Sequence, residues 1–209
     1  MTPFRTVSNP QSPPSEGGES FSSPLLHEIL GALDPTCRYV ILVPGAVNPG
    51  IVAMLQGKRC RLVVADATSA LSELDGQSLE SDALAERVTQ LILDAGPEKV
   101  DAVLCWDLLN YMSPPLLKAF ASRLVAIMSP NGKLHAYIHS ASPEMPQYPQ
   151  HYTLLENDQV IRLAPDPSLR KTPRYSYGDL EKHAAGLRVF RSVLLRNGMQ
   201  EYLLHVSQE

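Results

Sequence analysis

The chain contains the stretch Tyr39-Val40-Ile41-Leu42-Val43-Pro44-Gly45-Ala46-Val47-Asn48-Pro49-Gly50, in which hydrophobic residues lead into a loop with two glycines. A second hydrophobic run, at 61–65, ends in Asp66, about 20 residues after the first loop begins. In open α/β sheets, a loop after one strand and a carboxylate at the tip of the next hold the ribose of a nucleotide-like cofactor. The two runs therefore predict neighbouring parallel strands with a ligand site at their carboxyl ends.

Composition indicates an ordinary globular protein. The chain has 209 residues, of which 44% are hydrophobic and 19% charged, and this length suits one domain with a sizeable core. The net charge of −4 does not indicate nucleic-acid binding. No apolar run approaches the roughly 18 residues of a membrane span, and the N-terminus lacks the hydrophobic region of a secretory signal. We expect a cytoplasmic protein without membrane association.

The cysteines and histidines do not indicate a metal site. Cys37, Cys60 and Cys105 lie in or beside apolar runs without metal-ligand spacing, which predicts reduced thiols in the core. His135 and His139 lie four apart on one predicted strand, with no third ligand evident, so structural or solvent-facing histidines are favoured.

The domain organisation follows from a change in composition near residue 23. Residues 1–22 are rich in proline, serine and glycine, and such a segment buries too little apolar surface to offset the entropy lost on ordering. We predict a disordered tail over 1–22 and a single α/β domain over 23–209. Within this domain, residues 140–175 are expected to form an inserted loop and a hairpin.

The order of elements predicts the fold class. Hydrophobic spacing predicts strands at 38–43, 61–65, 100–106, 133–139, 189–195 and 201–206, a hairpin at 151–163, and helices at 25–33, from 49, at 69–75, at 82–95, from 113 and at 179–185. No strand is evident in 67–80, and 140–150 reads as an irregular loop. With β/α units first and an antiparallel hairpin across Asn197-Gly198 last, we predict three layers: a mostly parallel twisted sheet, helices on both faces and an antiparallel C-terminal hairpin.

Over residues 38–206 the chain resembles the class I S-adenosylmethionine-dependent methyltransferases, which have a Rossmann-like fold. The stretch 40–50 stands where the family has its glycine-rich cofactor loop, and Asp66 stands where it has its ribose-binding acid. Residues 100–112 are similar to the family's fourth strand and the loop beyond it, and 128–134 resemble its turn into strand five. The hairpin at Asn197-Gly198 matches the reversed last strand of that fold.

The resemblance implies S-adenosylmethionine as cofactor and methyl transfer to a substrate that the sequence does not identify. Substrate would enter over the carboxyl ends of the strands, under the loop 140–175, and Asn110 and Tyr111 begin a loop where many members place substrate-side residues. Asp66 would bind the ribose, and Ala67 would let the adenine approach. The cofactor-binding residues expected on this basis are Gly45, Ala46, Asn48, Gly50, Asp66, Ala67, Trp106 and Asp107.

Departures from the family pattern leave a second function open. Val43 holds a position that is usually acidic, Val47 stands where a middle glycine is expected, and Pro44 and Pro49 lack an N–H donor. The two glycines also fit a tight strand-to-helix connection that needs them for geometry alone. The alternative is therefore a non-catalytic relative that acts as a binding or scaffold subunit. A nicotinamide-dependent oxidoreductase is less favoured, because the dinucleotide fingerprint is broken.

Overall fold

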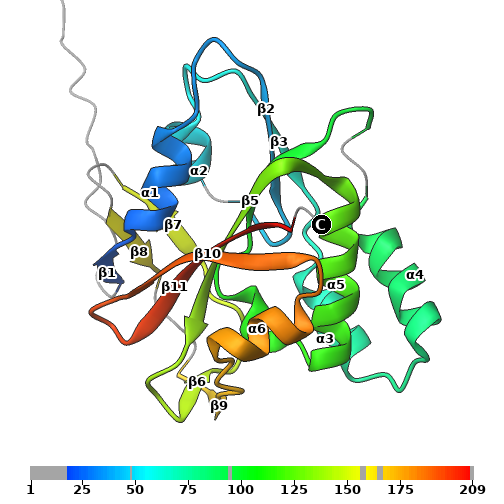
Figure 1. Cartoon of the computed structure of the whole chain (residues 1–209). Coiled ribbons are helices and arrows are strands. Elements are labelled where there is room, and N and C mark those ends of the chain that lie inside the picture. The colour runs from blue at the N-terminus through cyan, green and yellow to red at the C-terminus, as the bar shows by residue number, and fades with distance from the viewer. Residues whose placement is uncertain (1–17, 48, 94–95, 156–158, 164–166, 208–209) are drawn as a thin grey trace, which may run out of the picture.

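A six-stranded mixed sheet forms the centre of the molecule, in a computed structural model that describes residues 18–47, 49–93, 96–155, 159–163 and 167–207. The strand order is β10-β11-β5-β4-β2-β3 (Figure 1). The pairs β3–β2, β2–β4 and β4–β5 are parallel, whereas β5–β11 and β11–β10 are antiparallel. The bounds are β2 Tyr39–Val43, β3 Cys60–Val64, β4 Val100–Leu104, β5 Met128–His139, β10 Leu187–Leu194 and β11 Met199–Val206. The predicted fold class is confirmed.

Each face of the sheet carries its own layer, as Figure 1 shows. On one face the core is completed by α3 Thr68–Asp75, α4 Ser81–Leu91, α5 Pro114–Ile127 and α6 Tyr177–His183. On the other it is completed by α1 Pro24–Gly31, α2 Pro49–Met54 and a three-stranded sheet of order β1-β8-β7. This small sheet consists of β1 Glu19–Ser22, β8 Gln159–Arg162 and β7 Tyr152–Leu154. Among the described residues, no helix has both the length and the apolar character that a membrane crossing requires.

The strand β2 is apolar throughout because both of its faces are covered. In β2, Val40 and Leu42 belong to the core on the α3–α6 face, whereas Ile41 and Val43 belong to the core on the α1 face. This alternation is the two-residue period of a strand, and burial on both sides is typical of parallel sheets. The uninterrupted hydrophobic runs of the sequence therefore reflect position in the sheet.

Part of the predicted disordered tail is ordered, so that prediction is wrong for residues 19–22. These residues form β1, which pairs antiparallel with β8, with Phe21 opposite Val160. Phe21 is buried in the core on the α1 face. Composition alone indicated disorder because the partner strand lies more than a hundred residues away. Residues 1–17 of the predicted tail lie outside the described part of the chain.

The inserted segment contains more strand than predicted. The hairpin expected at 151–163 is confirmed as β7 and β8. Residues 144–146, predicted as irregular loop, instead form β6 Glu144–Pro146, which pairs antiparallel with β9 Leu169–Lys171. The prediction of core thiols is wrong for Cys37, which is exposed, while Cys60 is partly exposed and Cys105 is buried.

A buried carboxylate joins α1 to the sheet. Glu201 of β11 is fully buried. Its carboxylate accepts hydrogen bonds from the Ser23 hydroxyl at 2.6 Å and from the N–H groups of Leu25 and Leu26 at 3.2 and 3.0 Å. The ring of His135 on β5 lies 2.8 Å away. Glu201 thus satisfies N–H groups that the first turn of a helix leaves unpaired, and it does so from another element.

The same contacts control the ionisation of Glu201. Burial raises the pKa of its carboxyl group, but hydrogen bonding and charge from His135, with the hydrogen bonds of Ser23 and Leu26, outweigh burial and hold the pKa below its usual value. The carboxylate is therefore charged in the folded protein. A buried charge destabilises the fold unless all of these partners stay in place.

Removing this carboxylate is expected to destabilise the fold strongly. Because Glu201→Ala leaves buried donors without an acceptor, we expect the free energy of unfolding to fall by about 3–5 kcal/mol, measured by urea denaturation. Glu28→Ala is the matched control, since Glu28 on α1 forms a largely exposed ion pair with Arg191 and its loss should cost at most about 1 kcal/mol. Equal losses in the two variants would contradict the central role of Glu201.

Candidate functional site

A cavity of about 530 Å³ opens at the carboxyl ends of β2, β3 and β4. Ligands of open α/β sheets bind at this edge, and the volume is within the range of small-molecule sites. The structure brings together most residues selected from the sequence, because Gly45, Ala46, Asp66, Trp106 and Asp107 all line the cavity. Their role in binding a ligand stays a prediction.

Two of the selected residues that the structure describes, Gly50 and Ala67, are not among the residues that line the cavity. Asn48 lies outside the described part of the chain. A Cβ added at Gly50 would lie 2.8 Å from both the backbone N and O of Leu154, so Gly50 permits close packing of α2 against β7, and its contact with a cofactor stays a prediction. Ala67 is buried in the core, and its N–H donates to the Pro44 carbonyl at 2.8 Å. The adenine contact expected for Ala67 stays a prediction.

The loop after β2 has a structural reason for its first glycine and an open face on the cavity. A Cβ added at Gly45 would lie 3.1 Å from the Thr68 hydroxyl at the start of α3. Val47, which stands where a middle glycine was expected, packs against the core on the α1 face and is not among the cavity residues. Its branched side chain therefore leaves the cavity free. Val43 stands where the family usually has an acid, and its side chain is fully buried in the core. This position therefore contributes no carboxylate to the cavity.

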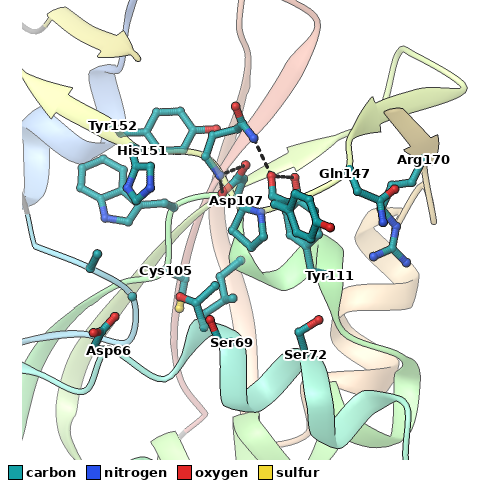
Figure 2. Close-up of a pocket in the computed structure, with 18 of the residues that line it drawn as sticks. Asp66, Ser69, Ser72, Cys105, Asp107, Tyr111, Gln147, His151, Tyr152 and Arg170 are labelled. Carbon is teal, nitrogen blue, oxygen red and sulfur yellow. Dashed lines mark hydrogen bonds between the residues drawn. The ribbon is translucent and has the colours of Figure 1, made fainter. Parts of the chain in front are cut away.

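Two cavity residues that follow parallel strands hold a backbone conformation that is costly for them. Asp66 comes after β3 with φ 46°, and Trp106 comes after β4 with φ 52°. The left-handed region costs a non-glycine residue about 1–2 kcal/mol, and such residues cluster at functional sites. Both residues line the cavity in this conformation. Figure 2 shows Asp66 beside the start of α3.

Asp107 is a buried carboxyl group at the wall of the cavity. Its two oxygens accept the Gln150 N–H at 3.2 and 3.1 Å, and only 1% of the residue is exposed. Burial raises the pKa of Asp107 to about 7, against the lowering effect of hydrogen bonds from Gln150 and Tyr152 and of the Arg162 charge. A carboxyl group with this pKa exchanges a proton near neutral pH.

Tyr111 fixes the segment that covers the cavity. It lies at the end of the short helix η1 Leu108–Tyr111, and its hydroxyl lies 3.1 Å from the Pro146 carbonyl and donates to the Tyr148 carbonyl at 2.8 Å. Together with the Gln150 bond to Asp107, this contact ties residues 146–150 to the end of β4 (Figure 2). One wall of the cavity is thus made by the inserted segment.

The neighbouring Asn110 has a structural part. Its amide nitrogen donates to the carbonyls of Asp107 and Tyr137 at 2.7 and 2.8 Å, and its amide oxygen accepts the His139 N–H at 2.9 Å. The side chain joins the end of β4 to β5, and it is not among the residues that line the cavity.

Aromatic rings form the upper side of the cavity in Figure 2. Trp106 and Tyr152 are stacked with ring centroids 5.4 Å apart and planes 12° apart. Tyr137, on the core side, lies 5.3 Å from the Tyr152 ring and 6.1 Å from that of Trp106. The sole tryptophan of the chain is therefore both a core residue and a cavity wall.

Sequence reasoning missed the cavity residues that come from α3 and from the inserted segment. Thr68, Ser69 and Ser72 share one face of α3, and helical spacing after Asp66 would have indicated them. Residues 147–150 carry no periodic signal in the sequence, because their placement depends on hydrogen bonds to Asp107 and Tyr111. The missed residues are Thr68, Ser69, Ser72, Glu73, Gln147, Tyr148, Pro149, Gln150, His151, Tyr152 and Arg170.

The two histidines of β5 are buried and are not among the residues that line the cavity. His135 contacts Glu201, as described above. Burial, with the charge of Arg162, lowers the pKa of His139 to about 4, so its ring is neutral at physiological pH. In the described residues, no group of three or more histidine, cysteine, aspartate or glutamate side chains is arranged to hold a metal ion.

Comparison with known proteins concerns the fold. No family model matches this chain, and no curated protein matches it by sequence. Protein PH0226 of Pyrococcus horikoshii is 13% identical, with a TM-score of 0.50 over 88% of this chain and 87% of its own. The 1,6-didemethyltoxoflavin-N1-methyltransferase of Burkholderia thailandensis, solved with S-adenosylhomocysteine, is 15% identical, with a TM-score of 0.49 over 88% and 76% of the two chains. The likeness to PH0226 concerns the arrangement of helices and strands.

Removing the charge of Asp107 is expected to change how stability depends on pH. Its pKa of about 7 in the folded protein lies above the ordinary value of 3.8, so the wild type loses stability as pH rises from about 4 to 7. Asp107→Asn abolishes this loss. Its free energy of unfolding relative to wild type should therefore rise by about 2–3 kcal/mol between pH 5 and pH 7.5, measured by urea denaturation.

Asp101→Asn is the control for this prediction, because Asp101 also accepts a backbone N–H, that of Val40 at 2.9 Å, but is partly exposed. A difference between Asp107→Asn and wild type that stays constant over this pH range would show that Asp107 does not titrate there.

The strained backbone at Asp66 predicts different stabilities for two variants that both lack its carboxylate. Glycine adopts φ 46° without a Cβ penalty, whereas alanine does not. We expect the free energy of unfolding of Asp66→Gly to be about 1 kcal/mol higher than that of Asp66→Ala, measured by thermal denaturation. If Asp66→Ala were instead the more stable variant, the loop would have relaxed out of the left-handed conformation.

Proposed function

We propose that this protein, which has the class I methyltransferase fold, is an S-adenosylmethionine-dependent methyltransferase. The observation that carries the proposal is the cavity at the carboxyl ends of β2–β4, with Gly45, Ala46 and the Asp66 carboxylate on its wall. This is the arrangement of loop and acid that holds a ribose in open α/β sheets. The sequence resemblance supports the same cofactor.

The residues present suit a nucleoside-containing cofactor. Asp66 would accept hydrogen bonds from the ribose hydroxyls, and the hydroxyls of Thr68 and Ser69 are further polar partners in the same part of the cavity. The stacked Trp106 offers an apolar wall for the rest of the molecule. When bound, the cofactor supplies an electrophilic methyl group on a positively charged sulfur.

Methyl transfer asks little of the protein beyond positioning, because holding the reacting atoms in line supplies most of the rate. One group could assist it further. Asp107 lies on the cavity wall, and its pKa of about 7 suits it to accept a proton from the methyl acceptor at neutral pH. We expect its carboxylate to hold that proton while Gln150 and Tyr152 keep the group in place.

The alternative is a non-catalytic protein of the same fold. It is favoured by Val43, which is fully buried where the family has an acid, and by the packing reasons that both glycines of the loop now have. A cytoplasmic location belongs to either proposal and is supported by three cysteines that form no disulfide.

Calorimetric titration with S-adenosylmethionine and S-adenosylhomocysteine tests the proposed function. We expect micromolar binding, and we expect Asp66→Ala to weaken it by about 1–3 kcal/mol, the scale of a lost charge-assisted hydrogen bond. Asp82→Ala is the control, since Asp82 is an exposed acid of α4 outside the cavity. Absence of binding at millimolar ligand by folded protein would support the non-catalytic alternative instead.

A further inference from the structure

The cavity has a second end whose chemistry differs from the part near Asp66. Here the wall comes from η1, from the segment after β6 and from β9, all outside the run of parallel strands. Its side chains include the rings of Tyr111 and Tyr148, the amide of Gln147 and the guanidinium of Arg170. Figure 2 shows Tyr111, Gln147 and Arg170 on the side of the cavity away from Asp66. None of these four residues belongs to the proposed cofactor site.

Arg170 is the notable group at this end. It lies on β9, opposite Met145 of β6, and its guanidinium carbon is 5.8 Å from the centre of the Tyr111 ring. In the described part of the chain, no salt bridge involves Arg170. A guanidinium over an aromatic face keeps its in-plane N–H donors available, and those donors match the two oxygens of a carboxylate.

The scaffold fixes the strand that carries this cation, while the Arg170 side chain itself is exposed. The β6–β9 pairing is extended by the Gln147 N–H, which donates to the Ser168 carbonyl at 2.9 Å. The Tyr111 hydroxyl holds the Pro146 and Tyr148 carbonyls. The aromatic ring beneath Arg170 and the strand that carries Arg170 are therefore tied to the same loop. A positive charge held over an aromatic wall, facing a cavity, selects for a flat ligand with a negative charge.

We propose that this second end binds the methyl acceptor and that the acceptor is a planar aromatic carboxylate with a nucleophilic hydroxyl group. This inference rests on the proposed methyl transfer. Arg170 holds the carboxylate, Tyr111 and Tyr148 flank the ring, and the hydroxyl lies toward Asp107. In the reaction an oxygen–methyl bond forms, the sulfur–methyl bond breaks with its electron pair left on sulfur, and the hydroxyl proton passes to the Asp107 carboxylate.

Two probes that differ only in charge test this assignment. The anionic probe is 3-hydroxy-2-naphthoate, and the neutral probe is its primary amide. Affinities are measured by calorimetry in the presence of saturating S-adenosylhomocysteine. Quenching of Trp106, the sole tryptophan and a cavity residue, reports that the probe is in the cavity. We expect the anion to bind at least tenfold more tightly than the amide.

Variants of β9 assign the preference to Arg170. Arg170→Ala should reduce the affinity for the anion at least tenfold, to that of the amide, and should leave the affinity for the amide and for S-adenosylhomocysteine within twofold. Lys171→Ala is the matched control, since Lys171 is the next residue of the strand, is exposed and is not a cavity residue. It should bind both probes as the wild type does. Circular dichroism confirms that each variant is folded.

The outcomes separate the two proposals. Binding of S-adenosylhomocysteine together with equal affinities for anion and amide would overturn the acceptor class and leave the methyltransferase proposal in place. An anion preference that survives Arg170→Ala, or that Lys171→Ala also removes, would overturn the role of Arg170. Failure of S-adenosylhomocysteine to bind would overturn the proposed function and, with it, the assignment of an acceptor.

Discussion

The structure depends on one buried negative charge. Glu201 lies on β11, between β10 and β5, and accepts hydrogen bonds from the first turn of α1 and from Ser23, with the ring of His135 beside it. A charge in this position is stable only while each partner stays in place, so the packing of α1 on the sheet is fixed by geometry as well as by apolar burial. The same Ser23 hydroxyl lies 2.6 Å from the Tyr137 hydroxyl, and through Tyr137 the constraint reaches the rings of Trp106 and Tyr152.

The functional end of the molecule is assembled by polar side chains that hold backbone groups. Asp107 and Tyr111 fix residues 146–150 over the ends of the parallel strands. The cavity is therefore made jointly by an ordinary α/β sheet and by an inserted segment that the sheet holds down. This division matches the two proposals: the sheet edge with Asp66 suits a cofactor, and the inserted segment with Arg170 suits its reaction partner. A fold of this kind hosts many reactions, and the chemistry is decided in the added segment.

Much of the fold could be predicted from the sequence because it follows local rules. The strand β2 is an uninterrupted apolar run, and β4 is interrupted only by Asp101, because both faces of these strands are covered. The C-terminal hairpin is indicated by Asn197-Gly198, where Gly198 indeed has φ 81°. By contrast, β1 and the β6–β9 pair were missed. Their strands are three or four residues long, and their partners lie far away in the sequence.

The order of the strands of the central sheet and of the helices around it, the sheet edge at which a ligand would lie and the position of Asp66 at that edge could all be inferred from the sequence. Periodicity and chain direction fix these features without reference to distant residues. Other features became visible only in the folded chain. Val47 packs against the core and Gly50 packs on β7. Asp107 is buried enough to raise its pKa, and Arg170 lines the cavity. Each of these depends on which distant segment lies against the residue, and a side chain's environment is a property of the folded chain.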